Sequence, residues 1–152
     1  MALFNVRIHA VVLDEQERIL LGHRSDKDLW DLPGGSLELG ELPIEGVVRE
    51  TREETGLDVE VERLFMVGVT PDSRLSFVFY CHPIGGALTP TEEADQVAFF
   101  SKDTLPEMIS PKKRSMIEAA YSHPAEIIYD HITQLSGTEW LAQLEKNING
   151  PV

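Results

Sequence analysis

The most constraining feature of this sequence is a group of acidic residues near the end of a predicted helix. Pro43 suits a first helical turn, and Gly56 suits the left-handed residue just past the last turn. Glu50, Glu53 and Glu54 lie between them at spacings of three and four, which brings all three carboxylates onto one side. Because like charges at these spacings destabilise an isolated helix, a divalent cation with oxygen ligands is the simplest counter-charge.

The same segment has an apolar stripe that indicates how the helix packs. The residues that recur at helical spacing on this stripe are Ile44, Val47, Val48 and Thr51. Gly46 lies beside the glutamates, and its missing side chain would let a metal ion or a phosphate approach the backbone. Arg49 stands four residues before Glu53 and could orient it through a bidentate hydrogen bond. A solvated acidic helix face is the alternative, but the Gly34–Gly35 turn and the ordered spacing to Glu41 argue against it.

The stretch around this helix resembles the Nudix hydrolase signature, which begins with a glycine and a glutamate and ends with an acidic helix and a second glycine. Every fixed position of that signature is filled here, by Gly35, Glu41, Arg49, Glu50, Glu53, Glu54, Gly56 and Leu57. Thr51 departs from the usual aliphatic residue, and its hydroxyl can bond to the carbonyl one turn earlier. Flanking segments are similar too, so the likeness covers roughly residues 5 to 120.

The resemblance implies an α/β fold, namely a Nudix-type α/β/α sandwich around a mixed β-sheet. The residue pattern predicts strands at 4–13, 18–23, 59–69, 75–82 and 96–101, and helices at 43–55, 111–121, 125–135 and 138–147. The first two strands would form a hairpin, and residues 25–40 and 83–94 would be loops. We expect one Nudix hydrolase domain over 1–152, with a core over about 5–121 and a C-terminal helical extension over about 122–152.

The resemblance also implies metal-dependent hydrolysis of a phosphoanhydride bond. Carboxylate-bound Mg²⁺ or Mn²⁺ neutralises the phosphate and lowers the pKa of the attacking water. We expect Glu50 and Glu54 to be the principal metal ligands, with Glu53 as a further ligand. The family contributes a backbone carbonyl that maps to Gly34 and a late acidic residue that maps to Glu93.

A general base must also reach the attacking water. Glu50 and Glu93 both qualify, and the neighbours Glu92 and Asp95 are further alternatives to Glu93. A plain solvated loop acid is the other interpretation of Glu93. The expected catalytic residues are therefore Arg49, Glu50, Glu53 and Glu93.

Substrate contacts are predicted at Arg24, which could hold a phosphate, at Trp30, which could stack on a base, and at Gly35. An exposed surface arginine and a tryptophan packed beneath the loop are the ordinary alternatives. The family cleaves a nucleoside diphosphate linked to another moiety, so ADP-ribose-like compounds, nucleotide sugars, dinucleoside polyphosphates and nucleoside triphosphates all remain open. Pro71 occupies a position where members that prefer ADP-ribose often carry proline, although it also suits an ordinary turn.

Composition limits the class of protein. The chain has 13 basic and 26 acidic residues, for a formal charge of −13, so no basic footprint for nucleic acid is expected. Its single cysteine, Cys81, lies in an apolar run and is compatible with a reducing compartment. Neither a signal segment nor a membrane-length apolar run is visible, so we expect a cytoplasmic protein.

Trp140, Leu141 and Leu144 form an apolar stripe that would pack against the domain or against a second subunit in a homodimer.

One alternative function belongs to a different class. A regulatory module could use the same pocket to sense a nucleotide without cleaving it. Such modules often lose carboxylates of the signature, whereas this chain keeps the full set. A hydrolase acting on a small nucleotide is therefore the favoured prediction.

Overall fold

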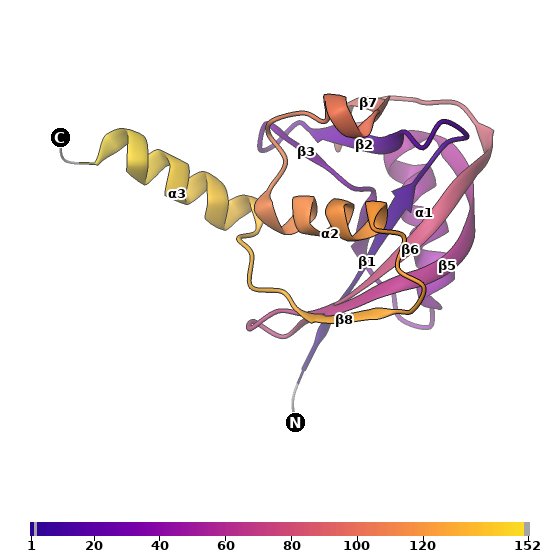
Figure 1. Cartoon of the computed structure of the whole chain (residues 1–152), viewed down its shortest axis with the longest axis horizontal. Coiled ribbons are helices and arrows are strands. Elements are labelled where there is room, and N and C mark those ends of the chain that lie inside the picture. Colours follow the sequence, from indigo (N-terminus) through magenta and orange to yellow (C-terminus); the bar gives the residue numbers. More distant parts are fainter. Residues whose placement is uncertain (2, 151–152) are drawn as a thin grey trace.

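The computed structural model describes Met1 and residues 3–150, which form two β-sheets and three α-helices in the order shown in Figure 1. The main sheet has the strand order β4-β1-β6-β5-β8, and the small sheet has the order β3-β2-β7. The main-sheet strands are β1 (Asn5–Val12), β4 (Gly34–Ser36), β5 (Leu57–Val69), β6 (Arg74–Gly86) and β8 (Ile128–His131). The small-sheet strands are β2 (Ile19–Arg24), β3 (Leu29–Asp31) and β7 (Ala94–Phe100).

Two of the three helices cover opposite faces of these sheets, as the predicted sandwich requires. They are α1 (Pro43–Thr55), α2 (Pro111–Tyr121) and α3 (Gly137–Asn149), with a short 3-10 turn, η1 (Lys102–Thr104), before α2. Figure 1 shows α2 across one face, α1 on the other side, and α3 projecting away from the body. β1 pairs parallel with β6 and antiparallel with β4, so the main sheet is mixed. The predicted α/β fold class is therefore confirmed.

Successive side chains of strand β1 alternate between two clusters of the hydrophobic core. Ile8, Ala10 and Val12 belong to the buried cluster that includes Val47 of α1. Val11, on the opposite face, belongs to the cluster that includes Met116 of α2. Because successive side chains of a strand point to opposite faces, one strand supplies both layers of the core.

Helix α1 begins and ends where the sequence predicts. Pro43 occupies its first turn, and Gly56 closes it with a φ of 79°, which an L side chain rarely adopts. The Thr51 hydroxyl donates to the Val47 carbonyl at 2.7 Å, which satisfies it inside the core. The predicted stripe is wrong at Ile44, which is exposed, because the helix approaches the sheet through the next turn.

Gly46 makes that close approach, and the predicted opening for a ligand beside it does not exist. A Cβ atom there would lie 2.5 Å from Ile8 Cδ1, and the Glu41 and Leu37 side chains also fill the space. This glycine therefore lets α1 pack tightly on β1. Its role is packing and not ligand access.

The helix predicted at 125–135 is wrong, because residues 128–131 form strand β8. This strand pairs parallel with β5, with Met66 beside Ile128 and Val69 beside His131. Ile132 follows it and is buried against Gly68, which leaves space for its side chain. The helix predicted at 138–147 is confirmed as α3, whose capping box is closed by Ser136 and Glu139.

Three smaller expectations are also corrected. The predicted hairpin keeps only its turn and one bridge, between Leu13 and Ile19, because β2 leaves β1 to pair with β3 and β7 in the small sheet. The predicted loop at 25–40 contains the short strands β3 and β4. The predicted loop at 83–94 is shorter, because β6 continues to Gly86. Among the described residues, no helix combines the length and apolar character that a membrane crossing demands.

Candidate active site

A cavity of about 480 Å³ opens where α1, β1, β4, the end of β2 and the start of β7 meet. Six of the residues predicted from the sequence line it: Arg24, Gly34, Gly35, Glu50, Glu54 and Glu93. These residues come from four separate segments of the chain, so the fold gathers most of the predicted site into one place. Arg49, Glu53 and Trp30 do not belong to this wall.

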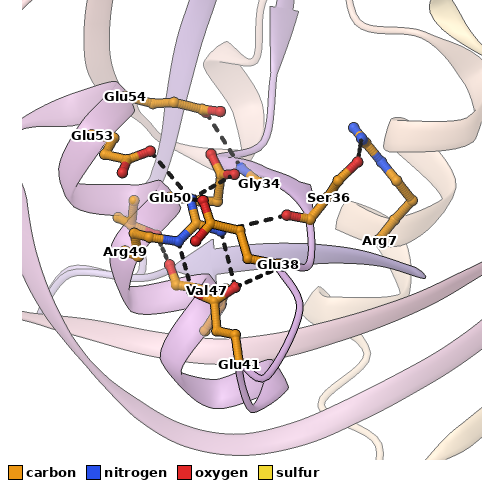
Figure 2. A network of polar contacts seen from close by, with 11 residues as sticks. Arg7, Gly34, Ser36, Glu38, Glu41, Val47, Arg49, Glu50, Glu53 and Glu54 are labelled. Atoms are coloured by element: carbon orange, nitrogen blue, oxygen red, sulfur yellow. Dashed lines mark hydrogen bonds and ion pairs between the residues drawn. The ribbon is translucent and has the colours of Figure 1, made fainter. Parts of the chain in front are cut away.

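Arg49 is the centre of a polar network at the carboxylate end of the cavity (Figure 2). Its Nε and Nη2 atoms donate to the two carboxylate oxygens of Glu41 at 2.6 and 3.0 Å. Its Nη1 atom donates to Glu50 at 3.0 Å and to Glu53 at 3.2 Å. The bidentate partner is thus Glu41 and not Glu53 as predicted. Glu41, followed by Glu50, raises the pKa of Arg49, so the guanidinium is a fixed positive charge.

Glu50 and Glu54 face the cavity from adjacent turns of α1. The Glu50 side chain is only 13% exposed, and a Cβ atom on Gly35 would lie 2.5 Å from its Oε1 atom. Glycine at position 35 is therefore required by the position of Glu50. The Gly34 N–H donates to Glu54 Oε2 at 3.3 Å, which holds the second carboxylate against the β4 backbone.

The carboxylates of Glu50 and Glu54 repel each other when both are charged. Burial, followed by the nearby charge of Glu50, raises the pKa of Glu54 to about 8. Among the described residues, no three acidic, histidine or cysteine side chains are yet arranged around one point, and Arg49 holds Glu50 and Glu53 instead. Two acidic side chains with hard oxygen donors facing one opening nevertheless suit a divalent cation such as Mg²⁺.

Glu53 and Glu93 occupy different positions relative to the cavity. The Glu53 side chain is 59% exposed and extends from Arg49 toward solvent, outside the cavity wall. Glu93 lines the cavity, and its charge contributes to the raised pKa of Glu54. Its loop is tied to the end of β2, because Ser25 donates from its hydroxyl to the Glu92 carbonyl and from its N–H to the Glu93 carbonyl.

Of the predicted substrate contacts Arg24 and Trp30, only Arg24 lines the cavity. Arg24 lines the cavity and donates to both carboxylate oxygens of Asp26, at 3.0 and 2.8 Å. Trp30 is directed into the core instead, where its ring packs edge-on against Phe100 at 4.9 Å between centroids. This geometry therefore supports packing beneath the loop as the role of Trp30, and not stacking on a base.

The lining residues that were not predicted from the sequence include Arg7, His9, Asp31 and Lys113. His9 is 2% exposed, and neither ring nitrogen has a hydrogen-bond partner among the described residues. Burial, followed by the charge of Lys113, holds the pKa of His9 well below its usual range, so the ring is neutral. The alternation of β1 was the only sequence signal, since it places Arg7, His9 and Val11 on one face.

Comparison with known proteins agrees with this geometry. Residues 3–120 match the NUDIX domain family. A MutT-like protein of Streptomyces ambofaciens is 40% identical over 111 residues, covering 71% of each chain. An ADP-ribose pyrophosphatase of Methanocaldococcus jannaschii is 37% identical over 64% of this chain and 62% of its own length. The human 8-oxo-dGDP phosphatase NUDT18 is 39% identical over 64% of this chain, but only 32% of that longer protein is matched.

Solved structures show the same relationship. A NUDIX hydrolase from Nitrosomonas europaea superposes with a TM-score of 0.74 and 26% identity, over 87% of this chain and 81% of that one. A UDP-X diphosphatase superposes with a TM-score of 0.71 and 28% identity, over 86% of this chain and 68% of that one. Three of the signature residues, Gly35, Glu50 and Glu54, line one cavity, and the family match spans most of the sequence. This chain is therefore a member of the Nudix hydrolase family.

Proposed function

We propose that this protein hydrolyses a phosphoanhydride bond in a nucleoside diphosphate linked to another moiety, with Mg²⁺ or Mn²⁺ as cofactor. The observation that carries the proposal is the pair of carboxylates, Glu50 and Glu54, that faces one cavity from adjacent turns of α1. The names of the relatives support the substrate class, because they include an ADP-ribose pyrophosphatase and an 8-oxo-dGDP phosphatase. Which nucleotide this chain takes is part of the proposal.

Each protein group has a defined task in this reaction. Glu50 and Glu54 would hold the cation, with Gly34 and Glu93 beside them and Glu53 as an outer ligand that must swing in from solvent. When bound, the cation neutralises the phosphate and lowers the pKa of water near it. Glu41 holds Arg49, and Arg49 in turn fixes the carboxylate of Glu50.

A carboxylate must then accept the proton of the water that attacks phosphorus. Glu50 and Glu93 both line the cavity, so either can reach a water molecule inside it. Glu93 lies on an exposed loop, whereas Glu50 is already bonded to Arg49 and is directed at the cation site. Because Glu50 is occupied by Arg49 and by the cation, we favour Glu93 as the base, in which case Glu93 does not also bind the cation.

The cellular setting and the oligomeric state are two further proposals. Cys81 is a free, buried thiol whose pKa burial raises to about 12, which suits a reducing compartment such as the cytoplasm. A homodimer through α3 is a second proposal. It is supported by the partly exposed stripe of Trp140, Leu141 and Leu144 on this projecting helix.

A panel of nucleotides assayed with Mg²⁺ and with Mn²⁺ tests the proposed reaction. We expect release of a nucleoside monophosphate or inorganic phosphate, and loss of turnover by a factor of about 10² or more in Glu54→Gln. Glu60→Gln, an exposed substitution on β5, is the matched control and should keep full activity. If the native protein turns over no nucleotide with either cation, the nucleotide-sensing alternative replaces the hydrolase.

A further inference from the structure

The buried side-chain atoms that lack a hydrogen-bond partner gather on one face of the main sheet. Among the described residues they are the two ring nitrogens of His9 and the hydroxyl of Ser76. β1 and β6 pair in parallel, with Arg7 beside Ser76 and His9 beside Val78. Side chains of paired residues project from the same face, so Arg7, His9 and Ser76 all lie on the α2 side. A buried polar group without a partner is energetically unfavourable, so a ligand that supplies the missing hydrogen bonds would stabilise this position.

The same region concentrates positive charge in a strongly acidic protein. Arg7 is half-buried and donates from Nη1 to the Ser36 hydroxyl at 2.8 Å, but within the described part of the chain it has no ion pair. Lys113, at the start of α2, donates to Asp31 at 2.5 Å, which occupies one of the three donors of its ammonium group. Lys112 is 6% exposed, and burial, followed by the charges of Lys113, Arg74 and Arg7, lowers its pKa to about 8.

This basic face is continuous with the catalytic cavity. Arg7, His9 and Lys113 line the same cavity as Glu50 and Glu54. His9 Nδ1 lies 2.9 Å from the position that a Cβ atom of Gly34 would occupy, so no side chain separates it from β4. Figure 2 shows Arg7 beyond Ser36, on the side of the view away from the helix carboxylates. The cavity thus has an acidic end that suits a cation and a basic end that suits an anion.

We propose that Arg7, His9 and Lys113 bind a terminal, uncapped phosphate group of the substrate. The inference rests on the proposed function, because the anhydride of the same nucleotide must lie at Glu50 and Glu54. A free terminal phosphate carries nearly two negative charges at neutral pH, whereas a phosphate capped by a sugar carries one. Two cationic side chains and a neutral imidazole donor match the free group better. The substrate is then a nucleoside di- or triphosphate, in preference to ADP-ribose or a nucleotide sugar.

Steady-state kinetics of Arg7→Gln and Lys113→Gln test this assignment. Their charge-matched controls are Arg18→Gln, in the turn after β1, and Lys102→Gln, in η1; neither residue lines the cavity. Losing a charge-assisted hydrogen bond should raise KM for nucleoside di- and triphosphates about tenfold or more, with a smaller change in kcat. KM for ADP-ribose should change less than about threefold. Equal changes for capped and uncapped substrates, or none for either, would overturn the assignment.

Binding of inorganic phosphate, measured by calorimetry, separates this inference from the proposed function. We expect phosphate to bind the native protein and both controls, and to bind Arg7→Gln and Lys113→Gln about tenfold more weakly. This assay needs no turnover, so it tests whether the basic site binds an anion even if no nucleotide is hydrolysed. Arg7→Lys, which keeps the charge, should bind with intermediate affinity and covers the case in which Arg7→Gln fails to fold. Phosphate binding that is absent, or equal in all variants, would show that the basic face is not an anion site.

Discussion

At the scale of single residues, the site depends on how one arginine distributes its donors. Arg49 gives two hydrogen bonds to Glu41 and one each to Glu50 and Glu53, so Glu41 fixes the guanidinium and the guanidinium fixes Glu50. Arg49 also lowers the pKa of Glu41, which keeps this carboxylate charged. Among the described residues Glu41 does not line the cavity and is linked to Glu50 through Arg49, so we infer that it is a positioning residue.

The first prediction concerns this arrangement. Glu41→Gln keeps the size of the side chain but removes its charge, so Arg49 should shift toward Glu50 and Glu53 and compete with the cation. We expect the Mg²⁺ concentration for half-maximal activity to rise about 10–100-fold, as is typical when a group supporting a metal ligand is lost. A Mg²⁺ titration of activity checks it. Glu38→Gln is the control, because Glu38 approaches Arg49 only to 3.7 Å and is exposed.

At the scale of elements, the fold depends on a strand that joins the sheet late in the chain. β8 pairs with the end of β5, and Ile132 then fills the space above Gly68, where a Cβ atom would lie 2.3 Å from Ile132 Cδ1. The sequence pattern favoured a helix here because Ala125 to Leu135 contains apolar residues at helical spacing. The open edge of β5 offered backbone partners that a helix could not use, and pairing with this edge decided the outcome.

The second prediction follows from this contact. Ile132→Ala should lower the free energy of unfolding by about 2–5 kcal/mol through loss of buried volume. Gly68→Ala should lower it by about 1–3 kcal/mol through overpacking. Because each substitution changes the same space, the double variant should be more stable than the sum of the two effects predicts. Urea denaturation of the four proteins measures this coupling, and simple additivity would contradict the described packing.

At the scale of the whole molecule, charge is distributed unevenly. The chain has a formal charge of −13, yet Arg7, Lys112 and Lys113 contribute to a common electrostatic environment around buried His9. Lys112 is buried and has no ion pair among the described residues. Burial of this positive charge therefore lowers the stability of the folded protein when no anion is bound.

The third prediction is a pH dependence of stability. The folded-state pKa of Lys112, about 8, lies below its unfolded value of about 10.4. Below pH 8 both states are protonated and the penalty is constant; above pH 8 the folded state releases its proton first, so stability rises with pH. Lys112→Met should be more stable than the native protein by about 2–3 kcal/mol at pH 7, and the difference should shrink toward pH 9.5. Urea denaturation across this range checks it, and a constant difference would contradict it.

The sequence by itself determined the features that depend on local spacing. The bounds of α1, the left-handed Gly56 and the acidic side of the helix follow from residues within one or two turns of each other. The signature from Gly35 to Leu57 determined the family, and the order of strands and helices was compatible with the fold.

Only the tertiary structure decided which distant segments meet. Arg7, His9 and Lys113 are unremarkable in sequence, because two lie on an ordinary strand and one in the first turn of an ordinary helix. They become one basic end of the cavity when β1 pairs beside β6 and α2 covers the same face. β8 likewise exists because β5 has a free edge to pair with. Local periodicity records which face of an element is apolar, whereas contacts between elements are set by packing and by long-range backbone hydrogen bonds.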